Sequence, residues 1–192
     1  MSGLRIAALA VALTVAACAA LVREEGAPRA PEPFDLSGRV VVSYDGRAFS
    51  SSLRWQHLPE RDEIWLLTPL GQALAHIVNA ADGATFTGAD RKQYHGSGVE
   101  GLTRQALGWE LPLTRLQYWV RGESVPGSTA EGVERDASQR LTRLVQDEWH
   151  ISIAHYPPDE HGGLPRRLEL TRGSNETIRL VIDGWRRDPA AP

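Results

Sequence analysis

Alternation of apolar and polar residues along short segments most limits the folds open to this chain. In "RVVVSY" Val40 and Val42 fall on one face, and in "SSSLRW" Leu53 and Trp55 do. Successive side chains of a strand point to opposite faces, so this spacing is typical of β-strands with one buried face. The Asp-Gly dipeptide at 45–46 separates the two segments and predicts a tight hairpin turn.

The same alternation predicts strands along most of the chain. Before position 99 they are "EIWLL", "ALAHIV", "ATFTG" and "RKQYHG", and after position 139 they are "RLTRLVQ", "EWHISIAHY", "RRLELTR" and "TIRLVIDGW". Together with the first hairpin, this gives a mainly β protein of about ten or eleven antiparallel strands.

The middle of the chain has a different pattern. Apolar residues recur at helical spacing over 99–109, and a second helix is expected to start at Pro112 and stop near Gly122. The segment 122–132, "GESVPGSTAEG", is predicted to be a long polar loop. Such short helices offer less apolar surface than the strands present. A curved sheet around a cavity, with helices over its mouth, is therefore favoured over a filled sandwich.

The N-terminus has the three-part layout of a bacterial secretory signal. Arg5 precedes an apolar run over 6–15, and small residues lead to Cys18. Cys18 is the only cysteine, which excludes an intramolecular disulfide and a metal–thiolate cluster. The segment "VAAC" resembles the lipobox of bacterial lipoproteins, in which the cysteine is acylated and becomes the first mature residue. Ala19 follows it, and the resemblance then implies sorting to the outer membrane.

Two other interpretations of this segment stay open. A transmembrane anchor needs about 20 apolar residues, and the run over 6–22 is shorter and rich in alanine. A plain secretory signal with an incidental cysteine is the other. The favoured organisation has four parts: a lipoprotein signal peptide at 1–17, a flexible tether at 18–33, one folded domain at 34–187 and a tail at 188–192.

The composition gives little support to nucleic-acid binding or catalysis. The net charge is −3 and no basic run occurs, so no nucleic-acid partner is predicted. Ser97 follows His95 at close spacing, but the segment "HGSG" lacks the G-x-S-x-G pattern of a nucleophile elbow. His150 and His155 are five apart on a predicted strand and therefore on opposite faces. We predict that the chain is not an enzyme and has no metal site or cofactor.

The turn "TPLGQ" at 68–72 presents an unusual feature. Pro69 and Gly71 are typical turn residues, and between them stands Leu70, where a polar side chain is expected. A single exposed leucine is common and needs no special explanation.

Several segments, taken in order, resemble the LolB family. They are the lipobox at Cys18, "FDLSGRVVV", "LRWQ", "LLTPLGQ", "GWELPLTRLQYWVRG", "DEWHISIAHY", "LPRRLEL" and a terminal strand ending at Trp185. The periplasmic carrier LolA has a similar fold but no lipobox, so Cys18 favours the outer-membrane receptor.

The resemblance implies an open, half-closed antiparallel β-barrel with short helices capping the mouth. It implies a monomeric receptor that is lipid-anchored at Cys18 in the outer membrane and faces the periplasm. Its partners would be a LolA-like carrier, the acyl chains of lipoproteins and outer-membrane lipids. The loop between the third and fourth strands would carry an exposed hydrophobic residue for membrane insertion. Here that residue is Leu70, flanked by Pro69 and Gly71, and a shift of register would make it Leu67.

An acyl-binding cavity would need apolar lining from the inward faces of the strands and the second helix. The expected lining residues, each with ordinary core packing as the alternative, are Val42, Leu53, Trp55, Leu66, Leu116, Trp119, Trp149 and Ile151. Three other functions stay open: a lipid-anchored binding protein for a fatty acid or lipopolysaccharide fragment, a hydrolase using Ser97 with His95, and a structural outer-membrane component.

Overall fold

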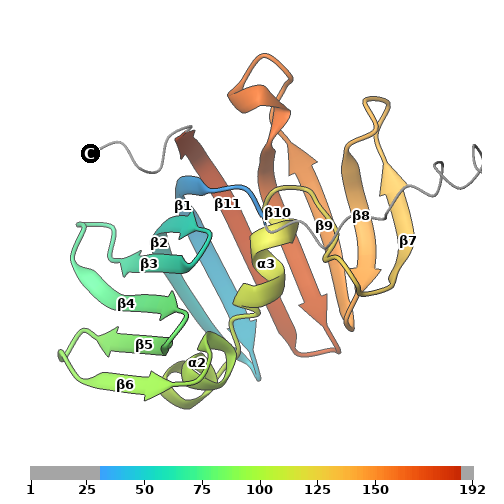
Figure 1. The fold of residues 1–192 in the computed structure, drawn as a ribbon. Helices are drawn as coiled ribbons and strands as arrows, with labels where there is room; N and C mark the ends of the chain where they lie inside the picture. The colour runs from blue at the N-terminus through green and yellow to red at the C-terminus, as the bar shows by residue number, and fades with distance from the viewer. Residues whose placement is uncertain (1–30, 187–192) are drawn as a thin grey trace, which may run out of the picture.

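One antiparallel sheet dominates the computed structural model, which describes residues 31–186 (Figure 1). Within these residues it has eleven strands in the order β6-β5-β4-β3-β2-β1-β11-β10-β9-β8-β7. The strands are β1 (Phe34–Tyr44), β2 (Arg47–Leu58), β3 (Arg61–Leu67), β4 (Ala73–Ala80), β5 (Gly83–Gly88), β6 (Gln93–Gly96), β7 (Ala130–Arg135), β8 (Leu141–Gln146), β9 (Trp149–His155), β10 (Pro165–Arg172) and β11 (Glu176–Arg186).

The sheet is open. The first strand, β1, pairs with the last strand, β11, in the middle of the sheet. β6 and β7 form the two edges of the sheet. The sheet twists strongly, so that β3–β6 run across the view of Figure 1 while β7–β11 run up and down it. The predicted open, half-closed antiparallel barrel is confirmed, and the strand number agrees with the upper expected value.

The hairpin turns follow from local turn chemistry. Asp45 and Gly46 have φ values of 47° and 74°, which is the type I′ geometry of a two-residue hairpin, and Tyr44 pairs with Arg47. The second and third predicted hairpins also form, as β3–β4 and β5–β6.

Burial alternates along the strands as predicted. On β1 and β2, Val40, Val42, Leu53 and Trp55 are buried, whereas the exposed Arg39 lies on the outer face. The inward faces of β1–β5 and β8–β11 share one apolar core with the helices.

Two short helices lie on the inner side of the sheet: α2 (Val99–Leu107) and α3 (Leu113–Trp119). α2 packs against β5 and β6. It ends before Trp109, contrary to expectation, because Gly108 adopts a left-handed φ of 82° and its N–H bonds to Arg104 O at 3.1 Å. Pro112 precedes α3 instead of occupying its first turn. A 3₁₀ turn, η2 (His161–Gly163), lies between β9 and β10.

The expectation of a polar loop over all of 122–132 was wrong at its end. Residues from Ala130 onward form β7, which pairs with β8. The strand gives no alternation signal because it is an edge strand whose residues, from Glu131 on, are exposed on both faces.

In the described part of the chain, no helix has the length and apolar character needed to cross a membrane.

Candidate functional site

Leu70 stands at the tip of the β3–β4 hairpin with 89% of its surface exposed. Among the described large apolar residues the next value is 46%, for Val133. Pro69 and Gly71 beside it are also exposed, whereas Leu67 is half-buried at the end of β3. The residue that the sequence singled out in this turn therefore points into solvent.

The turn that carries Leu70 is held by its own backbone. The Thr68 N–H donates to Gln72 O at 2.8 Å, and the Gly71 N–H donates to Thr68 O at 2.9 Å. The Gln72 N–H also donates to the Thr68 hydroxyl at 3.1 Å, and Gly71 takes a φ of 82° that glycine adopts without strain. The exposed leucine is thus mounted on an ordered turn.

An apolar cavity of about 30 Å³ lies between the sheet and the segment 109–116. Four of the residues predicted to line a cavity border it: Leu53, Trp55, Leu66 and Leu116. The sequence missed the others, which are Val40, Ile64, Ile77, Trp109, Leu111, Ile178 and Leu180. Small-molecule pockets have volumes of about 300–1,000 Å³, so this space is too small to hold an acyl chain in this conformation.

A second hollow, of about 390 Å³, lies beside the β1–β2 turn and the end of α2. We call it the mouth hollow, and it is lined by Val42, Tyr44, Asp45, Arg47, Ala48, Phe49, Leu107, Gly108 and Trp109. Trp109 borders both spaces, so its ring stands between the mouth hollow and the apolar interior. Val42, predicted to line the interior, is placed here.

Trp119, Trp149 and Ile151 were also predicted as lining, but they border neither space. All three are fully buried in the core, where α3 meets β8 and β9. The two indole rings pack on each other with centroids 6.4 Å apart, and the Trp119 indole N–H donates to Gln146 Oε1 at 3.0 Å. Alternation along a strand gives the buried face but not the position of the helix that covers it.

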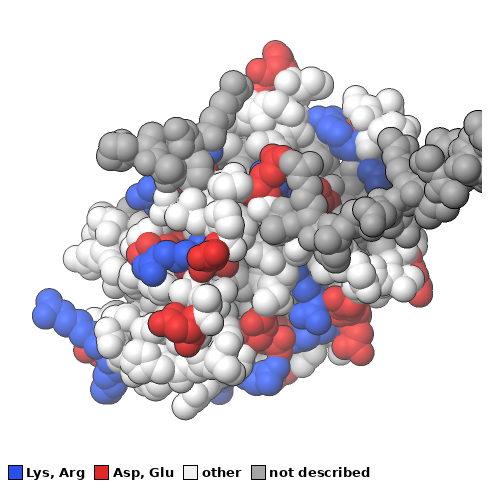
Figure 2. Space-filling view, in the orientation of Figure 1, with Lys and Arg blue, Asp and Glu red and all other residues white. Residues whose placement is uncertain are grey.

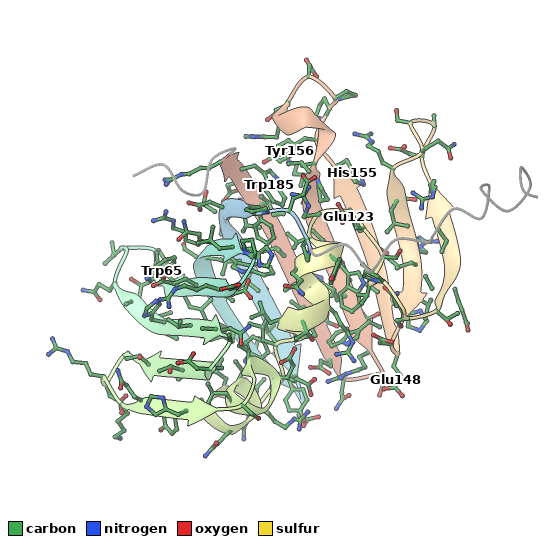
Figure 3. The ribbon with its side chains drawn as sticks, viewed as in Figure 1. Trp65, Glu123, Glu148, His155, Tyr156 and Trp185 are labelled. Carbon is green, nitrogen blue, oxygen red and sulfur yellow. The ribbon has the colours of Figure 1, made fainter. Side chains whose placement is uncertain are left out.

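The segment 109–119, which we call the cover, is bonded to the β7–β11 side of the sheet by polar contacts, whereas α2 before it packs against β5 and β6. Arg115 Nε donates to Asp147 Oδ2 at 2.6 Å, and Arg172 lies 3.8 Å from the Glu110 carboxylate. Asp147 sits in the β8–β9 turn, at the lower end of those strands beside the labelled Glu148 (Figure 3). Hydrogen bonds from Ser128 and Arg115 lower the pKa of the Asp147 carboxyl below its ordinary value.

Gln146, a buried residue at the end of β8, adds a second set of bonds on this side. Its Oε1 accepts from the Trp119 indole and, at 2.9 Å, from the Val125 N–H. Its amide nitrogen donates to Val125 O and Ser128 O. The end of α3 and the chain that follows it are therefore fixed to β8.

Toward β1–β4 the cover presents apolar side chains. Trp109, Leu111 and Leu116 face the strands across the 30 Å³ cavity. We call this boundary the apolar seam. Dispersion and hydrophobic contacts are non-directional, so the seam can widen with fewer broken hydrogen bonds than the β7–β11 side.

A buried polar group lies at the β2–β3 turn. Asp62 Oδ1 is 2.7 Å from His57 Nδ1 and accepts from the Trp55 indole N–H at 2.9 Å. Phe34 stacks on the His57 ring at 5.0 Å. These contacts hold β1, β2 and β3 together, and none of them places a nucleophile beside His57 and Asp62.

The residues of the proposed hydrolase are not arranged for catalysis. His95 Nδ1 lies 3.1 Å from Thr85 Oγ1, and within residues 31–186 no hydrogen bond joins His95 to Ser97. Both side chains are exposed at the end of β6. In the same span, no group of three His, Cys, Asp or Glu side chains has metal-binding geometry. Cys18 lies outside the described residues.

The open antiparallel sheet with two short helices on its inner side has a counterpart among solved structures. A LolA superfamily protein from Nitrosomonas europaea matches it with a TM-score of 0.50 at 10% identity, over 84% of this chain and 89% of the other. The family model for the outer membrane lipoprotein LolB matches residues 32–185. The chain belongs to the LolB family.

Curated relatives agree with this assignment. An outer-membrane lipoprotein LolB from Nitrosomonas europaea is 39% identical over 84% of this chain and 76% of its own. One from Chromobacterium violaceum is 36% identical over 94% of this chain and 98% of its own. The resemblance in the sequence is therefore confirmed, and the family is not known as a family of enzymes.

Proposed function

We propose that this protein is an outer-membrane receptor that accepts lipoproteins from a LolA-like periplasmic carrier and promotes their incorporation into the membrane. The observation that carries the proposal is the interior of the sheet. Eleven apolar side chains and no polar lining surface surround a space beneath a cover bonded mainly on one side. Such a surface suits hydrocarbon and offers nothing to a polar ligand.

The interior has to open to hold acyl chains. We infer that the cover moves away from β1–β4 along the apolar seam, while Arg115 and Trp119 keep it bonded to Asp147 and Gln146. Trp109 lies between the mouth hollow and the seam, so its displacement would join the two spaces. The entering chains would replace the contacts that the seam loses, which lowers the cost of opening.

The energetics favour transfer without a chemical energy source. Exposing an acyl chain to water costs about 0.8 kcal/mol per methylene, so the carrier and the receptor each have to shield the chains from water. The chains then move from carrier to receptor to membrane whenever each binds them more favourably than the one before. Because the seam closes when it is empty, opening it lowers the receptor's affinity for the acyl chains. The membrane can then bind the chains more favourably than the receptor does.

We propose that Leu70 is the membrane-insertion residue and Cys18 the lipid-attachment residue, with Pro69 and Gly71 shaping the insertion turn. Full burial of one leucine contributes about 1.5–3 kcal/mol, which is too little to bind a membrane alone. The tether at 18–33, at no more than about 3.5 Å per residue, reaches roughly 55 Å. It would therefore keep the domain near the bilayer and make the Leu70 contact effectively intramolecular.

A reconstituted handover assay tests this function. The full-length protein, in vesicles, is mixed with a carrier–lipoprotein complex, and lipoprotein is measured first on the receptor and then in the bilayer. We expect Leu70→Glu to accept lipoprotein normally and to lose most of the incorporation. Val133→Glu is the matched control, because Val133 is also an exposed apolar residue but lies on β7 at the other edge.

Two results would contradict the proposal. Normal incorporation by Leu70→Glu would show that the turn has no special role in release. Failure of the folded wild-type protein to accept lipoprotein, together with tight binding of free fatty acid, would favour the lipid-anchored fatty-acid binder instead.

A further inference from the structure

The β5–β6 hairpin ends beside the turn that carries Leu70. In the register of β4 and β5, Ala75 pairs with Gly88, so the turns at 68–72 and 89–92 leave the same end of the sheet. Figure 1 shows both turns at the left edge of the molecule. A membrane that meets Leu70 along this edge therefore comes close to the second turn as well.

The second turn carries two cationic side chains. Arg91 and Lys92 are both exposed, and Lys92 is the only lysine of the chain. Asp90 lies 2.9 Å from Lys92 and offsets one of the two charges. In Figure 2 basic side chains project from this edge next to the uncharged surface of the β3–β4 turn.

The turn is ordered and holds Arg91 in a costly conformation. The Gly88 N–H donates to Lys92 O at 2.9 Å, and the Arg91 N–H donates to Gly88 O at 2.9 Å. Arg91 has a φ of 64°, a region in which glycine or asparagine fits with less strain than arginine. Strained backbone conformations occur more often at functional sites than elsewhere, so this turn is a candidate for a functional role.

We propose that the β5–β6 turn is a second membrane contact, in which Arg91 and Lys92 bind the phosphates of anionic phospholipids while Leu70 enters the bilayer. The partner is the lipid surface itself. Arginine and lysine pair with phosphate oxygens through charge-assisted hydrogen bonds. A basic turn beside an apolar one matches a bilayer surface, which offers charged headgroups above hydrocarbon. This inference rests on the proposed function, because it assumes that Leu70 meets the membrane.

A fluorescent probe on the turn tests the inference. Ala89→Cys is labelled with an environment-sensitive dye in the full-length protein, which is then reconstituted into phosphatidylcholine vesicles with or without phosphatidylglycerol. We expect the emission to shift to the blue only when the anionic lipid is present. The shift should weaken in about 0.5 M salt, where the Debye length is roughly 4 Å.

Charge variants identify the groups responsible. Arg91→Asn/Lys92→Gln removes both positive charges and keeps a residue that tolerates the left-handed φ. We expect the equilibrium constant for contact of the turn with the membrane to fall roughly fivefold for each charge removed. Arg167→Gln is the matched control, because Arg167 is an exposed arginine in the middle of β10 and should leave the shift unchanged.

Equal shifts in neutral and anionic vesicles would overturn the inference, as would an unchanged shift in the double variant. Handover of lipoprotein is measured on the same samples, so the two proposals fail separately. Normal handover without an anionic-lipid response would contradict the headgroup contact and leave the proposed function standing. An anionic-lipid response without handover supports the headgroup contact and contradicts the proposed function.

Discussion

The cover meets the two sides of the sheet in different ways. On the β7–β11 side, Asp147 and Gln146 bind it through directed hydrogen bonds. Toward β1–β4, Trp109, Leu111 and Leu116 border a small void whose other lining residues are apolar side chains of these strands and of β11. Directed bonds fix an orientation, whereas apolar contacts tolerate sliding and separation. The difference supports the proposal that the cover stays attached on one side and opens on the other.

The largest stability effect is expected on the bonded side. Gln146→Leu leaves the Trp119 indole N–H and the backbone groups of Val125 without partners. Each buried polar group left unpaired costs about 1–3 kcal/mol, so the free energy of unfolding should fall by about 3–5 kcal/mol. Urea denaturation measures it. The control Gln117→Leu, at a half-buried position on α3, should change it by less than about 0.5 kcal/mol.

A truncation at the seam should have a smaller cost and a distinct second effect. Leu116→Ala should lower the free energy of unfolding by about 2–4 kcal/mol and enlarge the cavity. It should also increase the uptake of an apolar fluorescent dye. Leu144→Ala removes an equally buried leucine of β8 that does not border the cavity. Similar dye uptake by both variants would show that the apolar seam opens no more readily than the β7–β11 side.

The Arg115–Asp147 contact predicts a dependence on pH. Because the pKa of Asp147 is lowered in the folded state, its contribution to stability is present above about pH 4 and is lost as the pH falls below that. Asp147→Asn should destabilise the protein by about 1–2 kcal/mol at pH 7. The difference from wild type should shrink in unfolding experiments near pH 3, and a constant difference would show that the charge is irrelevant.

The smallest stability effect is expected at Leu70. Because the side chain is 89% exposed, Leu70→Ser should change the free energy of unfolding by less than about 0.5 kcal/mol. Thermal denaturation checks this. A larger loss would mean that Leu70 packs within the domain, contrary to a role in membrane contact.

Local chemistry made much of the fold predictable. The turn at 45–46 and the alternation on β1 and β2 depend on neighbouring residues, and both were predicted correctly. β7 was missed because an exposed edge strand needs no apolar face; its hydrogen bonds with β8 define it.

The candidate site was predictable only in part. The exposure of Leu70 follows from its place in a Pro-Gly turn, whereas its role was assigned from the family resemblance and stays a prediction. Trp109 could not, because its position between the mouth hollow and the interior depends on where the left-handed Gly108 directs the chain after α2. Trp119 and Trp149 were correctly predicted to face inward, but they pack on the bonded side, which depends on the distant Gln146.

Quenching of tryptophan fluorescence by brominated acyl chains tests the opening of the seam most directly. A synthetic lipopeptide with brominated chains is added to the full-length protein, and Trp109→Phe is compared with Trp65→Phe. Trp65 alternates with buried residues of β3 and stacks on His76 at 5.2 Å, away from the cover (Figure 3). We predict that Trp109→Phe removes a large part of the quenching and that Trp65→Phe removes almost none. Quenching that survives in Trp109→Phe and disappears in Trp65→Phe would place the chains on the outer face and contradict an interior that opens.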